Sequence, residues 1–65
     1  MQSTIKISQD QIESLLHLTE NYIRDARREM AENINNEAAC SLRLGSGFLN
    51  QAAVLLTLLT SSGNL

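Results

Sequence analysis

The spacing of apolar side chains over residues 12–34 constrains the fold more than any other feature of this sequence. They recur at intervals of three and four, which keeps them on one side of a helix with 3.6 residues per turn. The stripe consists of Ile12, Leu15, Leu16, Thr19, Tyr22, Ile23, Ala26, Met30 and Ile34. The sequence contains no proline, so nothing in its composition breaks this pattern. It predicts one long amphipathic helix.

Signals for the ends of this helix flank the stripe. Ser8 and Gln11 have the spacing of a capping box, with Ile7 placed as a hydrophobic staple, so the helix is expected to begin at Ser8. Residues 33–37, Asn-Ile-Asn-Asn-Glu, favour a turn because asparagine tolerates the left-handed conformation. Asn35 or Asn36 is expected to cap a second helix.

The second helix is apolar over more than half of its circumference. One stripe comprises Leu42, Gly45, Leu49, Ala52, Leu56 and Leu59. Another comprises Leu44, Phe48, Leu55 and Leu58. A single antiparallel helix covers only one of them, and an uncovered apolar band on a protein surface marks an interface. Leu44, Phe48, Leu55 and Leu58 are therefore predicted to bind a partner, as a helix face docks in a groove.

The expected fold is all-α, a two-helix antiparallel hairpin resembling a coiled coil, with helices over about 8–34 and 37–61. Residues 1–65 form one domain, and 1–7 are assigned to an extended or disordered segment. The residues predicted to pack within the hairpin are Ile12, Leu15, Leu16, Tyr22, Ile23, Ala26, Met30, Leu42, Leu49, Ala52, Leu56 and Leu59. Gly45 and Gly47 indicate a kink or a close helix contact, since glycine within a helix costs about 1 kcal/mol relative to alanine.

The sequence offers few residues that could carry out catalysis. Cys40 and His17 are the only cysteine and histidine, so no disulfide and no Cys/His zinc site can form within the chain. No nucleophile is paired with a base at helical spacing, and no enzyme activity or cofactor is expected. A chain of 65 residues buries a small core, so association with another chain is the expected source of further stability.

Charge and hydropathy narrow the expected partners to proteins. The net charge is −2, and acidic neighbours offset Arg24, Arg27 and Arg28, so nucleic acid is not the expected partner. The longest apolar run, residues 48–59, is shorter than the roughly 20 residues of a membrane span. We therefore expect no membrane helix. A lone Cys40 and a start without an apolar leader predict a cytoplasmic location.

Two segments resemble a known family. Residues 25–31 read Asp-Ala-Arg-Arg-Glu-Met-Ala, and residues 48–56 read Phe-Leu-Asn-Gln-Ala-Ala-Val-Leu-Leu. With the polar turn between them they resemble the YscE-like family, small co-chaperones of the type III secretion needle subunit, over roughly residues 15–65. The glycines at 45 and 47 and the asparagine-rich turn depart from the family pattern.

The resemblance implies a function that periodicity alone does not give. A hairpin of this family docks on a tetratricopeptide-like chaperone, and the two hold the needle subunit as a monomer in the cytoplasm until export. Leu44, Phe48, Leu55 and Leu58 would then contact the chaperone.

Two alternatives stay open. One is a homodimer in which two hairpins form a four-helix bundle and act as a small regulator or adaptor. The other is a regulator that binds nucleic acid through Arg24, Arg27 and Arg28, with affinity that falls steeply as salt rises.

Overall fold

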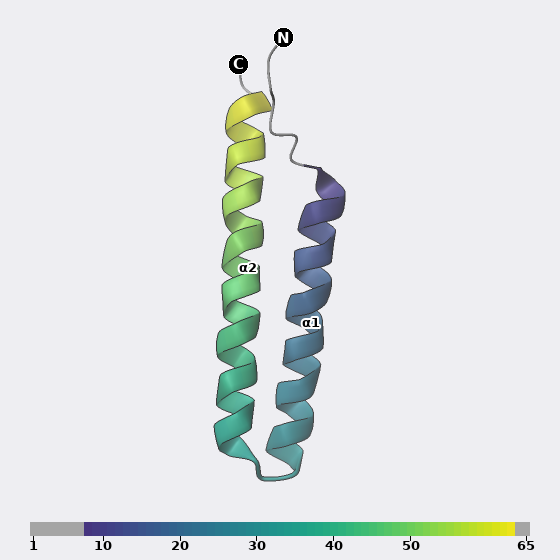
Figure 1. The fold of residues 1–65 in the computed structure, drawn as a ribbon, viewed down its shortest axis with the longest axis vertical. Coiled ribbons are helices and arrows are strands. Elements are labelled where there is room, and N and C mark those ends of the chain that lie inside the picture. The colour runs from purple at the N-terminus through teal and green to yellow at the C-terminus, as the bar shows by residue number, and fades with distance from the viewer. Residues whose placement is uncertain (1–7, 64–65) are drawn as a thin grey trace.

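The computed structural model consists of two antiparallel helices joined by a tight turn, and it describes residues 8–63, with side chains for 8–61. Helix α1 spans Gln9–Ala31 and helix α2 spans Asn35–Gly63. Figure 1 shows the two helices side by side along their length, with the turn at one end of the hairpin. The predicted all-α hairpin is confirmed. The segment expected to be extended or disordered, residues 1–7, lies outside the described residues.

The start of α1 follows its sequence signal. The Ser8 hydroxyl accepts a hydrogen bond from the Gln11 backbone N–H at 3.3 Å, and the Gln11 side chain accepts one from the Ser8 backbone N–H at 3.0 Å. This is the predicted capping box, which satisfies two backbone donors that the first turn leaves without partners.

The turn lies earlier in the sequence than predicted. Helix α1 ends at Ala31, three residues before the expected end, and α2 begins at Asn35, two residues earlier than expected. Asn33 has a φ of 63°, and the Ile34 N–H donates to the Glu29 carbonyl at 2.8 Å. This geometry closes the helix as a glycine would in a Schellman motif.

The start of α2 also differs from the prediction. The Ile34 carbonyl accepts from the Ala38 N–H at 3.0 Å, so the cap position belongs to Ile34 and neither Asn35 nor Asn36 occupies it. The predicted left-handed asparagine exists as Asn33. At the other end, α2 reaches Gly63, two residues beyond the expected end at residue 61.

The two helices meet along a seam whose residues alternate at intervals of three and four, the spacing of an antiparallel coiled coil. All are buried or half-buried. In α1 they are Ile12, Leu15, Thr19, Tyr22, Ala26 and Glu29; in α2 they are Ala38, Ser41, Gly45, Phe48, Ala52, Leu55 and Leu59. We call these thirteen residues the seam.

Small side chains occupy the most buried places of the seam. Ala26, Ala38 and Ala52 are only 2–3% exposed, and Ile12 is the one larger apolar residue in this group at 5%. No large side chain of the described part is completely buried. The helices therefore pack closely but enclose little apolar volume, as expected for a structure of only two helices.

Polar contacts cross the seam in two places. The Ser41 hydroxyl donates to the Glu29 carboxylate at 2.8 Å. The Thr19 hydroxyl lies 2.9 Å from the Leu15 carbonyl and 3.4 Å from the Gly45 carbonyl of α2. Every buried side-chain nitrogen or oxygen among the described residues has a hydrogen-bond partner, so these polar groups add specificity to the pairing at little desolvation cost.

Candidate interaction surface

The orientation of α2 differs from the one predicted for it. Leu42, Leu49 and Leu56, expected to pack on α1, are 46–50% exposed. Phe48, expected to bind a partner, stacks on Tyr22 with ring centroids 5.7 Å apart and an interplanar angle of 10°. Leu55 belongs to the seam and is half-buried. The packing assignment of these three exposed leucines was wrong because small residues form the closest contact between the helices. Partner binding by Phe48 and Leu55 stays a prediction.

The remaining predicted packing residues divide into two groups. Ile12, Ala26 and Ala52 are buried, and Leu15, Leu16, Tyr22 and Leu59 are half-buried, in agreement with the prediction. Ile23 and Met30 are 39% and 56% exposed. They lie at the margin of the apolar stripe of α1, where α2 does not cover them.

Gly45 allows the close approach of the helices. A Cβ added at this position would lie 3.2 Å from the Tyr22 Cβ and 3.6 Å from the Thr19 carbonyl oxygen. At Gly47 a Cβ would meet nothing within 4 Å. The predicted close contact is therefore made by Gly45 alone, and α2 continues as one helix through both glycines.

The exposed apolar residues form two surfaces on opposite sides of the seam. In an antiparallel pair, residues that directly follow a seam position lie on one side of the hairpin in both helices, and residues that directly precede one lie on the other. We call the first surface the Leu49 face; it contains the exposed residues Ile23, Met30, Leu42, Leu49 and Leu56, with the half-buried Leu16 beside them. We call the second the Leu58 face; it contains Leu18, Leu44, Leu58 and, beside them, Val54.

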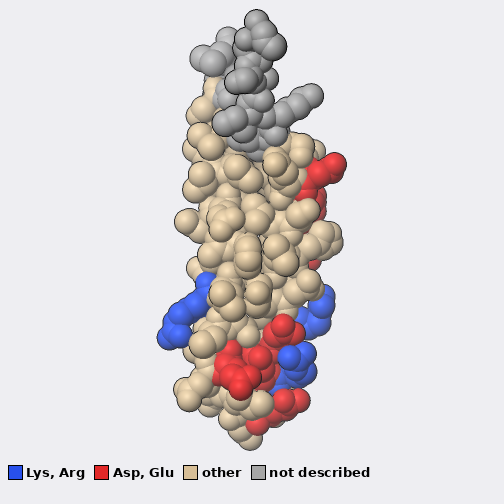
Figure 2. Space-filling model, in the orientation of Figure 1, with Lys and Arg blue, Asp and Glu red and all other residues tan. Residues whose placement is uncertain are grey.

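Charged residues are concentrated toward the turn. Figure 2 shows most of the acidic and basic side chains of this view at the turn end, while the surface above it is largely uncharged. Helix α2 carries only Glu37 and Arg43, and no charged residue follows Arg43 up to its end. Both apolar surfaces therefore continue along α2 without the charges that would oppose burial.

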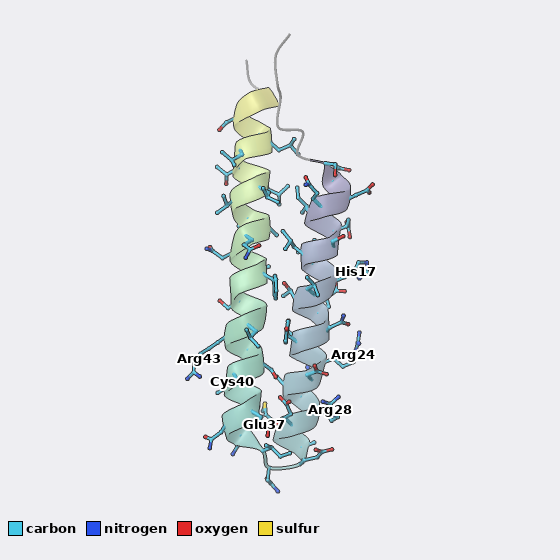
Figure 3. The ribbon with its side chains drawn as sticks, viewed as in Figure 1. His17, Arg24, Arg28, Glu37, Cys40 and Arg43 are labelled. Atoms are coloured by element: carbon cyan, nitrogen blue, oxygen red, sulfur yellow. The ribbon has the colours of Figure 1, made fainter. Side chains whose placement is uncertain are left out.

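The arginine cluster does not form a patch of one sign. Arg28 pairs with Asp25 at 3.1 Å, and Arg24 donates to the Asn21 side chain at 3.0 Å. Figure 3 shows Arg24 and Arg28 on the outer side of α1, with Arg43 projecting from the opposite side of the hairpin. Exposed pairs like these contribute little to stability, and acidic neighbours reduce the attraction of phosphate.

The only histidine and the only cysteine of the chain, His17 and Cys40, lie on different helices. His17 is exposed on α1 and lies 3.6 Å from the Glu20 carboxylate. Cys40 is exposed, although free cysteines are usually buried. The described residues contain no group of acidic, histidine or cysteine side chains that could hold a metal ion. A hollow of about 260 Å³, lined by Glu20, Ile23, Arg24 and Arg27, lies on the surface of α1.

Helix α2 is longer and more apolar than the run that the sequence suggested. Over Asn35–Ser61 it is long and apolar enough to cross a membrane by length and composition, and little of it is buried in the hairpin. Core helices of soluble proteins meet the same criterion, so this is weak support for a membrane span. The length of the apolar segment is therefore no longer an argument against a membrane span.

Comparisons with family models, curated proteins and solved structures find no match for this chain. The candidate site is therefore described by its geometry alone: a narrow helical hairpin with two apolar surfaces.

Proposed function

We propose that this chain is a binding protein without enzymatic activity, which docks through the Leu58 face onto a helical partner protein. The observation that supports the proposal is the exposure of Leu44, Val54 and Leu58, each 49–52% exposed on a helix with no charge after Arg43. Covering a half-exposed leucine yields about 1 kcal/mol, so several together favour docking.

Leu44 and Leu58 keep the partner-binding role expected for them from the sequence. Phe48 and Leu55 pack in the seam and hold α2, the docking helix, against α1. Anchors on one side of a helix, separated by whole turns, suit a partner that offers an apolar groove between helices. A tetratricopeptide-like protein, built of stacked helix pairs, has such grooves.

The sequence resemblance supplies the particular role. It leads us to propose a co-chaperone of type III secretion, acting in the cytoplasm, that stabilises a tetratricopeptide-like chaperone and indirectly holds the needle subunit as a monomer. A partner that binds only the folded chaperone raises its stability by mass action. The apolar surface of the hairpin suits this work, and nothing in the role requires catalysis.

Co-expression with a tagged tetratricopeptide-like type III chaperone from the same genome tests the proposal. The wild-type chain is expected to co-purify with the chaperone in equal amounts, and Leu44→Asp with Leu58→Asp should reduce recovery at least tenfold. Leu49→Asp serves as the matched control, because Leu49 is as exposed as Leu58 but lies on the other side of the hairpin. Its recovery is expected to match the wild type.

Two results would count against the proposal. Undiminished recovery of the double variant would remove Leu44 and Leu58 from the interface. Partition of the untagged chain into lipid vesicles, with no complex in solution, would instead favour a membrane role for α2 and remove the chaperone function.

A further inference from the structure

The Leu49 face is the larger of the two apolar surfaces and is separate from the proposed chaperone site. Three of its residues come from each helix, and five of the six are 39–56% exposed. The hairpin beneath it has no large side chain completely buried among its described residues. Helical domains bury such a stripe against a further layer of helices, so this face requires an occupant.

We propose that a second copy of this chain occupies the Leu49 face, forming an antiparallel four-helix bundle with the two turns at opposite ends. The residues bordering the face support this choice of occupant. On α1 the border consists of Glu13, Glu20 and Arg27, which directly follow Ile12, Thr19 and Ala26 of the seam. On α2 it consists of Ala39, Ser46, Ala53 and Thr60, which are small and uncharged.

The charged borders of two copies attract each other in only one orientation of the dimer. With the turns at opposite ends, α1 packs against α1 of the second copy, and Arg27 of each copy approaches Glu20 of the other. The same two-fold axis brings the small-residue borders of the two α2 helices together, where the helices can approach closely. With the turns at the same end, each charged border would instead meet an uncharged one and leave its charges without partners.

The surface of α1 has a hollow that could receive a side chain from the second copy. The hollow of about 260 Å³ is lined by Ile23 together with Glu20, Arg24 and Arg27. An α1 helix from the second copy, crossing here, would place an apolar side chain in the hollow and a charged one beside each wall. A two-fold interface uses the same patch twice, so both hollows are filled.

Light scattering and sedimentation on the purified chain, diluted from roughly 100 µM to 1 µM, test the second copy as occupant. The wild type is expected at twice the chain mass and helical by circular dichroism. Leu49→Glu should raise the dissociation constant at least a hundredfold, whereas Leu58→Glu should leave the mass unchanged. A monomeric wild type at 100 µM, or equal effects of the two substitutions, would overturn the proposal.

A charge exchange tests the orientation without disturbing apolar packing. Arg27→Glu is expected to weaken the dimer by roughly three- to tenfold, the size of exposed ion-pair effects. Combining it with Glu20→Arg keeps the net charge of the wild type and should restore affinity. If the double variant is as weak as Arg27→Glu alone, Glu20 is not the residue that Arg27 approaches.

A distance between the two turns gives an independent reading. A spin label at Glu32→Cys, with Cys40→Ser to remove the native thiol, is expected to show a separation of about 25 Å, which is twice the helical rise from residue 32 to a two-fold axis midway between Glu20 and Arg27. A separation shorter than about 20 Å would place the turns at the same end and overturn the orientation.

Discussion

The two helices of this hairpin use their residues differently. Helix α1 has one apolar stripe and a charged outer surface, so its sequence permits only one orientation against a partner helix. Helix α2 has apolar residues around most of its circumference and only Glu37 and Arg43 as charges. Its orientation is decided by its smallest residues, Ala38, Gly45 and Ala52, and its large apolar residues outside the seam stay exposed.

The difference shows how close packing and apolar burial can compete. Small residues in the seam allow the two backbones to approach, which improves dispersion contacts along the whole length of the helices. Turning α2 to bury Leu42, Leu49 and Leu56 would separate the helices and displace Phe48 from Tyr22. The leucines outside the seam are then free to bind other chains, which makes α2 the interaction helix of the molecule.

The substitution with the largest expected effect introduces a charge into the seam of α2. Ala52 is 2% exposed, so Ala52→Asp is expected to destabilise the fold by about 3 kcal/mol or more, because the carboxylate would have no partner among apolar neighbours. Urea denaturation followed by circular dichroism measures this.

Asn50 provides the control for that substitution. It lies on the outer side of the same helix and is exposed, so Asn50→Asp should change stability by no more than about 0.5 kcal/mol. Similar losses at the two positions would show that α2 is not seated through Ala52, and the described orientation would be wrong.

The sequence predicted the architecture well because each signal for it is local. The capping box at Ser8, the apolar stripe of α1 and the asparagine-rich turn each depend on residues that lie close together in the sequence. The left-handed residue proved to be Asn33, so the turn closes within three residues and both helix boundaries moved.

The orientation of α2 could not be obtained from hydrophobicity. A ranking by apolarity favours leucine over alanine and glycine, whereas the seam is selected by the distance between two backbones. The alternating spacing of Ala38, Ser41, Gly45 and Ala52 was available in the sequence, and small residues at that spacing are the signal that could have identified the seam. Partner identity depends on another molecule and has no local signal of this kind.

A second test separates two residues of α2 that the sequence had placed in one stripe. Phe48 stacks on Tyr22, so Phe48→Ala should cost about 2 kcal/mol of stability, less than at a fully buried site because the ring is only half-buried. Leu44 is 52% exposed, and Leu44→Ala should cost less than about 0.5 kcal/mol.

Thermal unfolding of these two variants beside the wild type, at one protein concentration, measures both effects. A Leu44→Ala variant that loses as much stability as Phe48→Ala would mean that the two side chains are equally covered in solution. The seam would then have to include Leu44.

The sharpest comparison concerns the two glycines of α2. Alanine at Gly47 would meet nothing within 4 Å, so Gly47→Ala should stabilise the helix by about 0.5–1 kcal/mol through the loss of backbone freedom in the unfolded chain. Gly45→Ala gains the same helical preference.

At Gly45 the new methyl group would lie 3.2 Å from the Tyr22 Cβ. That atom is fixed to the α1 backbone, so the helices must separate to relieve the contact, and overpacking of this kind costs about 1–3 kcal/mol. Gly45→Ala is therefore expected to lower the unfolding temperature while Gly47→Ala raises it. A rise at both positions would mean that α1 and α2 do not approach closely at Gly45, which would contradict small residues as the basis of the seam.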